Sequence, residues 1–475
     1  MSEILVQPVH EAGVEHSSRG ATLYALRELS RRAGVPHSEF IRWRITFHDR
    51  DYVGVYVRPG SDRHVRFPRI PLNFHWNSRL ANTQTITASW MNPGGRHFSG
   101  VANFKIPFSP AGARDIGPLF KPESPDSVVC RADLLTSLLL TLSRYEETLA
   151  VPRDEHGRFA ASSSMAWRDG FLDRPVVDEW GLAFAEAIRF LFPGWQPEEA
   201  VFRVKIAHDV DELGRPFKPR ATLAHVLRRH SPAAALRDFK ALFNGSPTTY
   251  QLLLHEVVAL ALARGLDTAV YWKCSGSGPH DTGYNPRHRK VRDMIFAFRD
   301  SGVELGIHPS YQSFDSHAAF QNEVSALKEI LQQDLVGGRQ DFLRWKPETW
   351  SVWEAEGIAY DASVGFADHI GFRAGTCHPY RPWLVDHGRE ADLLEIPLIA
   401  MDSTLLSYMR VSEEEALQKT RQCIARCRAV GGVFTLLWHN TRIMNPRHKT
   451  LYQTLLDDLH GSPSYDWRSA YHEIH

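Results

Sequence analysis

Short apolar runs alternate with helical patterns after residue 200, and this alternation constrains the fold more than any other feature of the chain. Seven runs rich in β-branched and aromatic residues are typical of buried strands: VFRVKIA (201–207), LDTAVYWK (266–273), VELGIHP (303–309), FLRWKP (342–347), IAYDAS (358–363), LLEIPL (393–398) and GVFTLLWH (432–439). Helical patterns lie between several of them, at 248–264, 287–300, 317–333 and 411–429. Asn285 and Pro286 are typical of the start of the second of these helices. Strands that alternate with helices form parallel β/α units, so the pattern predicts an α/β fold with a barrel of about seven strands.

The first 195 residues are organised differently. Their expected elements are helices over 21–34, 133–150 and 177–192 and a β-hairpin made of WRITF (43–47) and YVGVYVRP (52–59). Pro193, Gly194 and Pro197 interrupt the last helical pattern. Because 475 residues exceed what one ordinary core holds, we expect two domains, a smaller α/β domain over 1–195 and the barrel over 196–475.

Composition and charge argue against several classes of protein. The chain has 55 Lys and Arg residues and 55 Asp and Glu residues, so no overall field attracts nucleic acid or an anionic membrane surface. No stretch approaches the length of an uncharged membrane span, and the N-terminus lacks the pattern of a signal peptide, so we expect no stable membrane insertion. The 5 Cys residues have no framework spacing, which is typical of reduced thiols, and we expect a cytoplasmic protein.

Ionisable and polar residues cluster beside the predicted strands. The clusters are Asp209 with Asp211, His308, Arg339 with Asp341, Asp361 with Ser363, and His439 with Asn440. All but one follow a run, where the carboxyl ends of parallel strands meet at one rim; Arg339 and Asp341 precede FLRWKP and are the exception. Each residue alone has an ordinary explanation, such as a helix cap, a turn or a bond to a backbone carbonyl. Their common position favours a functional site.

Carboxylates and imidazoles that meet at such a rim are suitable ligands for a divalent metal ion. A catalytic metal site keeps one position open for water, and the ion lowers the pKa of that water. A second carboxylate can then act as a general base, while a separate His protonates the leaving group. Asp209 and Asp211 suit this division, because a strand places residues i and i+2 on one face. The pattern therefore predicts metal-dependent hydrolysis.

Residues from about 200 to 460 resemble the polysaccharide deacetylase family, the NodB-homology carbohydrate esterases, whose fold is a distorted (β/α)7 barrel. The stretch AHDVDE is similar to the first motif of that family, Thr-x-Asp-Asp, although its acids are spaced Asp-x-Asp. The resemblance implies that Asp209 is the catalytic base and that Asp211 is a metal ligand.

Two further motifs support the resemblance. HPSYQ is similar to the second family motif, His-x-x-x-His, which implies that His308 is a metal ligand. LWH matches the last motif, Leu-x-His, which implies that His439 is the general acid, and we expect Asp361 to orient it. Arg339 is similar to the family arginine that braces the base.

The third metal ligand departs from the family pattern. Gln312 stands where the second His of the motif is expected, and amides are poor ligands for zinc. Asp341 is the candidate replacement, because its spacing from Arg339 would direct both side chains to the same side. His208 and His317 are weaker candidates. We expect the cofactor to be a divalent ion, with Zn²⁺ as the first choice.

The expected substrate is a carbohydrate. Arg373, in a loop rich in aromatic and hydrogen-bonding residues (365–383), and Tyr311 and Trp438 beside the motif histidines are the predicted substrate-binding residues. The phrases LSRYEE, DEHGRF, GFRAGT and EIPLIAMDSTL are similar to one branch of the family, whose members carry an N-terminal accessory domain of uncharacterised role.

Three functions remain open from the sequence. The first is a metal-dependent deacetylase that hydrolyses an N- or O-acyl group on a sugar or polysaccharide precursor. The second is an inactive relative that binds glycan or assists surface-polysaccharide assembly, which Gln312 would favour. The third is another metal hydrolase that cleaves a C–N bond in a small amide.

Overall fold

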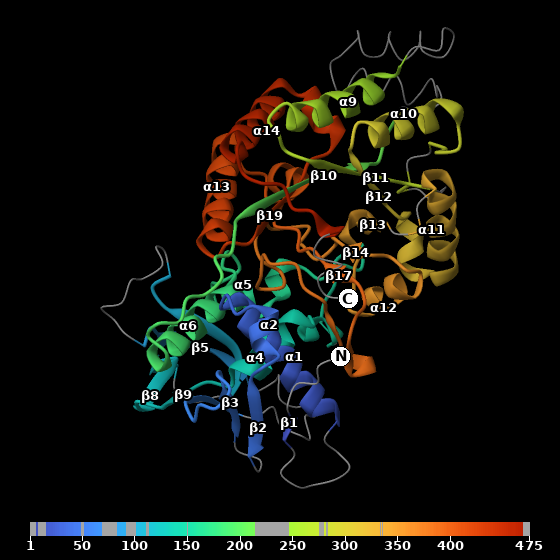
Figure 1. Cartoon of the computed structure of the whole chain (residues 1–475). Coiled ribbons are helices and arrows are strands. Elements are labelled where there is room, and N and C mark those ends of the chain that lie inside the picture. Colours follow the sequence, from blue (N-terminus) through green and yellow to red (C-terminus); the bar gives the residue numbers. More distant parts are fainter. Residues whose placement is uncertain are drawn as a thin grey trace.

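The computed structural model describes residues 6–7, 16–48, 52–68, 83–91, 101–110, 114–149, 151–213, 247–274, 280–281, 284–332, 334 and 336–468. In Figure 1 the first part of the chain (blue to green) lies below, and the second part (green through yellow to red) forms a curled sheet with helices around it above. Both parts combine helices and strands, so the predicted mixed α/β class is confirmed.

Six described strands of the first part form one sheet in the order β1-β2-β3-β4-β9-β8. They are β1 (Val6–Gln7), β2 (Arg44–His48), β3 (Tyr52–Tyr56), β4 (His64–Pro68), β8 (Phe120–Ser124) and β9 (Ser127–Cys130). β2 and β3 pair antiparallel, with Ile45 opposite Val55, which confirms the predicted hairpin. Every second residue of β2 is buried, because alternate side chains of a strand face opposite sides of the sheet.

Three longer helices pack beside this sheet. They are α1 (His16–Arg32), α4 (Leu134–Leu142) and α6 (Val176–Leu191), with the shorter α2 (His37–Phe40), α5 (Met165–Arg168), η2 (Tyr145–Thr148) and η3 (Ala161–Ser163) between them. A smaller sheet, in the order β6-β5-β7, consists of β5 (Thr83–Ser89), β6 (Phe104–Pro110) and β7 (Asp115–Pro118). The helix expected over 133–150 is shorter than predicted, because Arg144 adopts a left-handed conformation (φ 53°) that ends it.

The described residues of the second part include eight parallel strands in one sheet, in the order β17-β14-β13-β12-β11-β10-β19-β18. The strands are β10 (Arg203–Val210), β11 (Thr268–Trp272), β12 (Glu304–Ile307), β13 (Gly337–Gly338), β14 (Tyr360–Asp361), β17 (Leu394–Glu395), β18 (Ala400–Met401) and β19 (Val433–Leu437). Because all run in the same direction, their carboxyl ends share one rim. This is a curled sheet of the barrel type, and the count of seven β/α units stays a prediction.

The run predicted over 393–398 contains β17 and leads into β18, and these two strands stand at the two ends of the strand order. β17 pairs with β14, and after Pro397 the chain continues as β18, which pairs with β19. Between them, Ile396 N–H donates to the carbonyl of Asp361 at 2.8 Å, and Thr435 Oγ1 lies 2.8 Å from the amide of Ile399, whose proton it accepts. The segment from β17 to β18 therefore forms hydrogen bonds with both β14 and β19.

Helices cover the outside of the curled sheet (Figure 1). They are α9 (Thr249–Leu262), α10 (Arg289–Asp300), α11 (His317–Leu331), α12 (Glu348–Ala355), α13 (Glu413–Ala429) and α14 (Pro446–Leu459). Shorter elements in the loops are η4 (Tyr311–Asp315), η5 (Asp341–Leu343), η6 (Val385–His387), η7 (Thr404–Tyr408), η8 (Asn440–Met444), β15 (Trp383–Leu384) and β16 (Arg389–Glu390). Thr248 begins α9 with a complete capping box, and Ser412 caps α13, so local sequence fixes these starts.

Two local predictions are wrong. The run 342–347 is not a strand; the strand at this place is β13, and the turn η5 follows it. β13 requires its glycines, because a Cβ on Gly337 would overlap the ring of Tyr360 and one on Gly338 would overlap the backbone of Ile307. α10 begins at Arg289 after His288, because Asn285 instead accepts the backbone N–H of Arg287 in a preceding turn.

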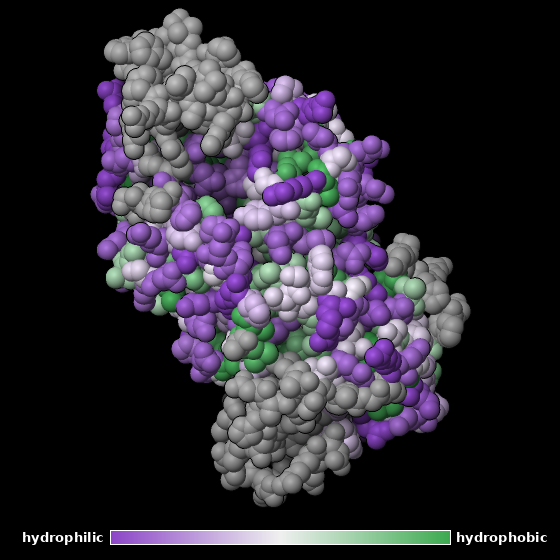
Figure 2. Space-filling view, turned by 180° about the vertical axis from the view of Figure 1, so that it is seen from behind, coloured by the Kyte–Doolittle hydropathy of each residue, from purple (hydrophilic) through white to green (hydrophobic). Residues whose placement is uncertain are grey.

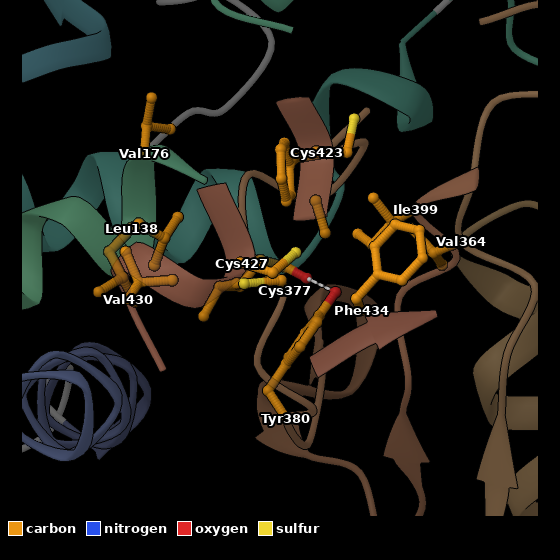
Figure 3. Packing of buried hydrophobic residues seen from close by; sticks show 14 of the residues in the cluster. Leu138, Val176, Val364, Cys377, Tyr380, Ile399, Cys423, Cys427, Val430 and Phe434 are labelled. Carbon is orange, nitrogen blue, oxygen red and sulfur yellow. Dashed lines mark hydrogen bonds between the residues drawn. The ribbon is translucent and has the colours of Figure 1, made fainter. Parts of the chain in front are cut away.

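One hydrophobic core runs through both parts of the chain. Figure 3 shows Leu138 of α4 and Val176 of α6 in the same cluster as Cys377, Cys427 and Phe434 of the second part. The 5 Cys residues are free thiols, as expected. The two parts therefore bury apolar surface against each other.

The visible surface is mainly hydrophilic. Figure 2 shows one face of the molecule, on which hydrophobic residues form small separate groups among hydrophilic ones. Among the described helices none has the length and apolar character needed to cross a lipid bilayer.

Candidate active site

A pocket of about 290 Å³ opens at the carboxyl-terminal rim of the curled sheet. Its walls contain Arg158, Asp209, Asp211, His308, Gln340, Asp341, Phe342, Leu343, Met401, Ser403, Ser407, Tyr408, Leu437, His439 and Arg442. The acids and histidines come from the ends of β10, β12, β13 and β19. Arg339 and Asp341, the exception in the sequence pattern, also follow a strand, because that strand is β13.

His308 lies between two carboxylates at this rim. Its Nε2 is 3.2 Å from Oδ1 of Asp211 and 3.2 Å from Oδ1 of Asp341. The three side chains offer ligand atoms within 4.8 Å of one another, and the side chain of Asp211 is 36% exposed toward the pocket. Ligand atoms about 2.0–2.1 Å from a tetrahedral zinc ion lie about 3.3 Å apart, so the two measured spacings fit such an ion.

Hydrogen bonding also prepares His308 as a metal ligand. Nδ1 of His308 donates to the carbonyl of Arg339 at 2.8 Å, since a carbonyl can only accept. In the neutral ring Nε2 is then the atom with the free lone pair, which is the arrangement that supports metal-binding histidines. Without an ion, burial by itself lowers the pKa of His308, but the carboxylates of Asp209, Asp211 and Asp341 raise it to about 10. The residues present therefore fit a divalent ion, which would take the place of that proton.

Lys273 enters the same cluster, which the sequence analysis did not anticipate. Its Nζ donates to Oδ2 of Asp341 at 2.8 Å and lies 3.6 Å from Oδ1 of Asp211 and 3.9 Å from Oδ1 of Asp281. Burial by itself lowers the pKa of Lys273, but Asp211 and Asp341 raise it above its ordinary value. The ammonium group therefore neutralises part of the negative charge that would attract a metal ion. Lys273 follows β11 directly, so its position at a strand end was the available signal.

Asp209 is held by an arginine on the inner side of the pocket. Nη1 of Arg339 donates to Oδ1 of Asp209 at 2.9 Å, and Nε of Arg339 donates to the carbonyl of Ala362 at 2.9 Å. Both side chains are buried. Arg339 thus provides the charge that a buried carboxylate requires and leaves Oδ2 of Asp209 on the side of His308, 3.8 Å from its Nδ1.

His439 lies beside the metal-ligand cluster (Asp211, His308 and Asp341) and is oriented by Asp402. Nδ1 of His439 lies 2.6 Å from Oδ1 of Asp402, and its backbone N–H donates to Oδ2 at 3.0 Å. Nε2 is 3.6 Å from Oδ2 of Asp211. Burial by itself lowers the pKa of His439, but Asp402 raises it to about 9. A protonated imidazole directed at the pocket is suited to general acid catalysis.

Asp361, which we expected to orient His439, does not contact it. Oδ1 of Asp361 accepts the backbone N–H of Ser363 at 2.9 Å and the hydroxyl of the same residue. β14, which carries Asp361, lies between β13 and β17, whereas β18, which precedes Asp402, pairs with β19 beside His439. Strand order therefore places Asp402 there. Burial raises the pKa of Asp361 to about 6.

The three predicted substrate-binding residues lie outside the pocket wall. Trp438 is fully buried and stacks on Tyr452, because it alternates with Leu437 and His439, which face the pocket. Arg373 is buried and donates to both oxygens of Glu147 and to the carbonyl of Gly365. It therefore joins the two parts of the chain. The hydroxyl of Tyr311 lies 3.2 Å from Nδ1 of His156 at the rim.

The other candidate ligands lie apart from the cluster. Gln312 is exposed on η4, so its amide lies outside the pocket wall. His208 is buried, with Nδ1 2.6 Å from the carbonyl of Trp438, and so points away from its flanking aspartates. His317 pairs with Glu356 at 2.8 Å on the surface. Of these candidates, Asp341 is therefore the one that lies beside Asp211 and His308.

Part of the chain matches a known family model. Residues 74–193 match the model of a family of unknown function (DUF7033). No curated protein matches the chain.

Several solved structures resemble between 57% and 59% of the chain. A putative polysaccharide deacetylase from Mycobacterium smegmatis is 12% identical, with a TM-score of 0.40 over 59% of this chain and 92% of that chain. A PuuE allantoinase is 15% identical, with a TM-score of 0.40 over the same shares. A putative polysaccharide deacetylase involved in O-antigen biosynthesis from Bordetella bronchiseptica is 13% identical, with a TM-score of 0.29 over 57% of this chain and 90% of that chain. At these identities and scores the likenesses say nothing about activity.

Proposed function

We propose that this protein is a metal-dependent hydrolase that removes an N- or O-acyl group from a sugar or polysaccharide precursor. The observation that carries the proposal is that His308, with its Nδ1 proton bound by a backbone carbonyl, lies 3.2 Å from each of two carboxylates at the floor of a pocket. The sequence resemblance to polysaccharide deacetylases supplies the class of substrate.

Asp211, His308 and Asp341 would hold Zn²⁺, which when bound lowers the pKa of water and polarises the acyl carbonyl. Asp209 takes a proton from the attacking water, because Arg339 occupies its Oδ1 and leaves Oδ2 available. The water oxygen bonds to the acyl carbon.

His439 completes the reaction as the general acid. Its Nε2 gives a proton to the sugar nitrogen or oxygen as the bond to the acyl carbon breaks, which releases a carboxylic acid and a free amine or hydroxyl. Asp402 holds the ring through Nδ1 and stabilises its protonated form. A pocket that only bound glycan would need neither this pair nor the braced Asp209, so we favour catalysis over an inactive relative.

The test uses purified full-length protein loaded with Zn²⁺ and a panel of N- and O-acetylated sugars together with small amides, with acid release as the readout. Asp209→Asn should abolish release and retain the metal. His308→Ala should lose the metal, whereas His317→Ala, a surface histidine paired with Glu356, should keep it. Stoichiometric metal with no release from any substrate would favour the glycan-binding alternative, and release from Asp209→Asn would exclude Asp209 as the base.

We further propose the two-domain division at residues 195 and 196 and a cytoplasmic location. The free state of the 5 Cys residues supports the location, because reduced thiols persist in a reducing compartment.

A further inference from the structure

A hairpin from the first part of the chain, residues 153–159, reaches the rim of the barrel. Arg153 and Phe159 form its antiparallel bridge, and Oδ1 of Asp154 accepts the backbone N–H groups of His156 and Arg158 at 2.9 Å each. The side chain of Arg158 lines the pocket beside the metal-ligand cluster. The first part of the chain therefore supplies a wall of the candidate active site.

The segment that this hairpin contacts has an unfavourable backbone. Phe342 and Leu343, which follow Asp341 directly, have φ values of 57° and 54°. Residues with a Cβ rarely adopt this left-handed conformation, and two in succession persist only where the surroundings hold them. Asp341, Phe342 and Leu343 all line the pocket, so this turn sets both the position of Asp341 and the shape of the wall.

Two residues of the hairpin hold this turn. Nη1 of Arg158 donates to the carbonyl of Phe342 at 3.1 Å and to the hydroxyl of Tyr408 at 3.1 Å. The carbonyl of His156 accepts Nε of Arg344 at 2.8 Å, and the rings of His156 and Phe342 pack with centroids 4.9 Å apart. The hairpin thus contacts the turn on both sides of Leu343.

Arg158 is itself rigidly placed. Its Nε donates to Oδ2 of Asp154 at 2.7 Å, and its side chain is 6% exposed. The buried guanidinium is thus hydrogen-bonded to Asp154 of the hairpin and to the carbonyl of Phe342, so the position of the hairpin fixes that of the carbonyl. The clamp is therefore a chain of direct hydrogen bonds from Asp154 to the turn.

We propose that hairpin 153–159 is a clamp that holds the 341–343 turn, and that Arg158 is the positioning residue that directs Asp341 toward His308. The link to metal binding rests on the proposed function, because that function makes Asp341 a ligand. The contact between the hairpin and the 341–343 turn does not depend on the proposed function. This gives the first part of the chain a role in building the site rather than in covering it.

The experiment compares full-length wild type, Arg158→Met and Arg153→Met. Arg153 is the matched control, because it lies in the same hairpin and, among the described residues, donates to the carbonyls of Gly157 and Glu147 and not to the 341–343 turn. Amide hydrogen exchange is followed at residues 342–344, where Leu343 N–H donates to Gln340 and Arg344 N–H to Asp341. The affinity for Zn²⁺ is measured by competition with a chromophoric chelator.

Arg158→Met should speed amide exchange in this turn about tenfold. It should also weaken Zn²⁺ binding about 10–100-fold, as the loss of a residue that supports a metal ligand does. Arg153→Met should change neither quantity. Arg158→Lys, which keeps one donor, should fall between them and gives the same test if Arg158→Met does not fold. Exchange in Arg158→Met equal to that of the wild type would overturn the clamp. A wild type that binds no Zn²⁺ would overturn the proposed function, and the exchange measurement would still decide the clamp.

Discussion

Replacing Asp402 by Asn tests the acid that the proposed reaction requires. Asp402 lies 2.6 Å from Nδ1 of His439 and holds the pKa of His439 at about 9. An ordinary histidine has a pKa of about 6.5. At pH 8 His439 is therefore about 90% protonated in the wild type and about 3% protonated in the variant, so the variant should contain about thirtyfold less of the acid form. At pH 6 the protonated fractions of His439 in the wild type and in the variant differ by less than about twofold.

The sign follows from the direction of the shift. A raised pKa keeps His439 protonated to higher pH, so activity that depends on the acid is present below the pKa and lost above it. In Asp402→Asn the alkaline limb of kcat should therefore move from about pH 9 toward about pH 6.5, and the loss of activity should be larger at pH 8 than at pH 6.

The assay is acid release by the Zn²⁺-loaded enzyme from about pH 5.5 to about pH 10. Asp361→Asn is the matched control, because Asp361 is a buried strand-end acid that contacts Ser363 and not His439. Its alkaline limb should stay in place whatever its effect on stability. The reasoning is refuted if Asp402→Asn leaves the limb at about pH 9, or if Asp361→Asn moves it.

Three further predictions concern charge. Lys273→Met should tighten Zn²⁺ binding, because Lys273 donates to Asp341 at 2.8 Å and competes for its charge; calorimetry that shows equal or weaker binding would contradict this. Arg373→Met should lower the free energy of unfolding by about 3 kcal/mol, because the buried carboxylate of Glu147 loses both hydrogen bonds from Arg373 and keeps Arg144 as its partner, and KM should not change. A raised KM in a stable variant would restore Arg373 to the substrate site. Glu28 has a folded pKa of about 2 against an ordinary value of 4.5: burial by itself raises it, but Arg31 and Arg32 lower it. The lowered pKa stabilises the folded state by about 3 kcal/mol above pH 4.5, and this stabilisation is lost as the pH falls toward 2. Glu28→Gln should therefore weaken the dependence of the free energy of unfolding on pH in this range, as measured by denaturant titration. A variant with the same pH dependence as the wild type would disprove this.

Local patterns in the sequence account for much of the site. The alternation of strands and helices predicts parallel strands with one functional rim, and the spacing of Asp209 and Asp211 predicts that both face the pocket. The same alternation, applied from His439, would have placed Trp438 on the opposite face, toward the helices. Asp341 joins His308 as the strand-like spacing from Arg339 predicts, although Asp341 begins the turn η5 and does not lie in a strand.

The partner of His439 was decided by the tertiary structure alone. Asp361 and Asp402 both follow apolar runs, so local pattern ranks them equally. Only the pairing of β18 with β19 brings Asp402 beside His439, and such pairing depends on how the whole sheet closes. Lys273 entered the cluster for the same reason, from β11 beside β12.

Apart from Arg339 and Asp341, the sequence by itself determined which site residues stand at strand ends and which face of each strand they occupy, because both follow from the two-residue repeat of a strand and its boundaries. Only the tertiary structure decided which of them meet, and that Arg158, from a distant hairpin, contacts the turn that carries Asp341. Contacts between segments far apart in the chain depend on strand order, strand length and the packing of the two parts, and no local pattern encodes these.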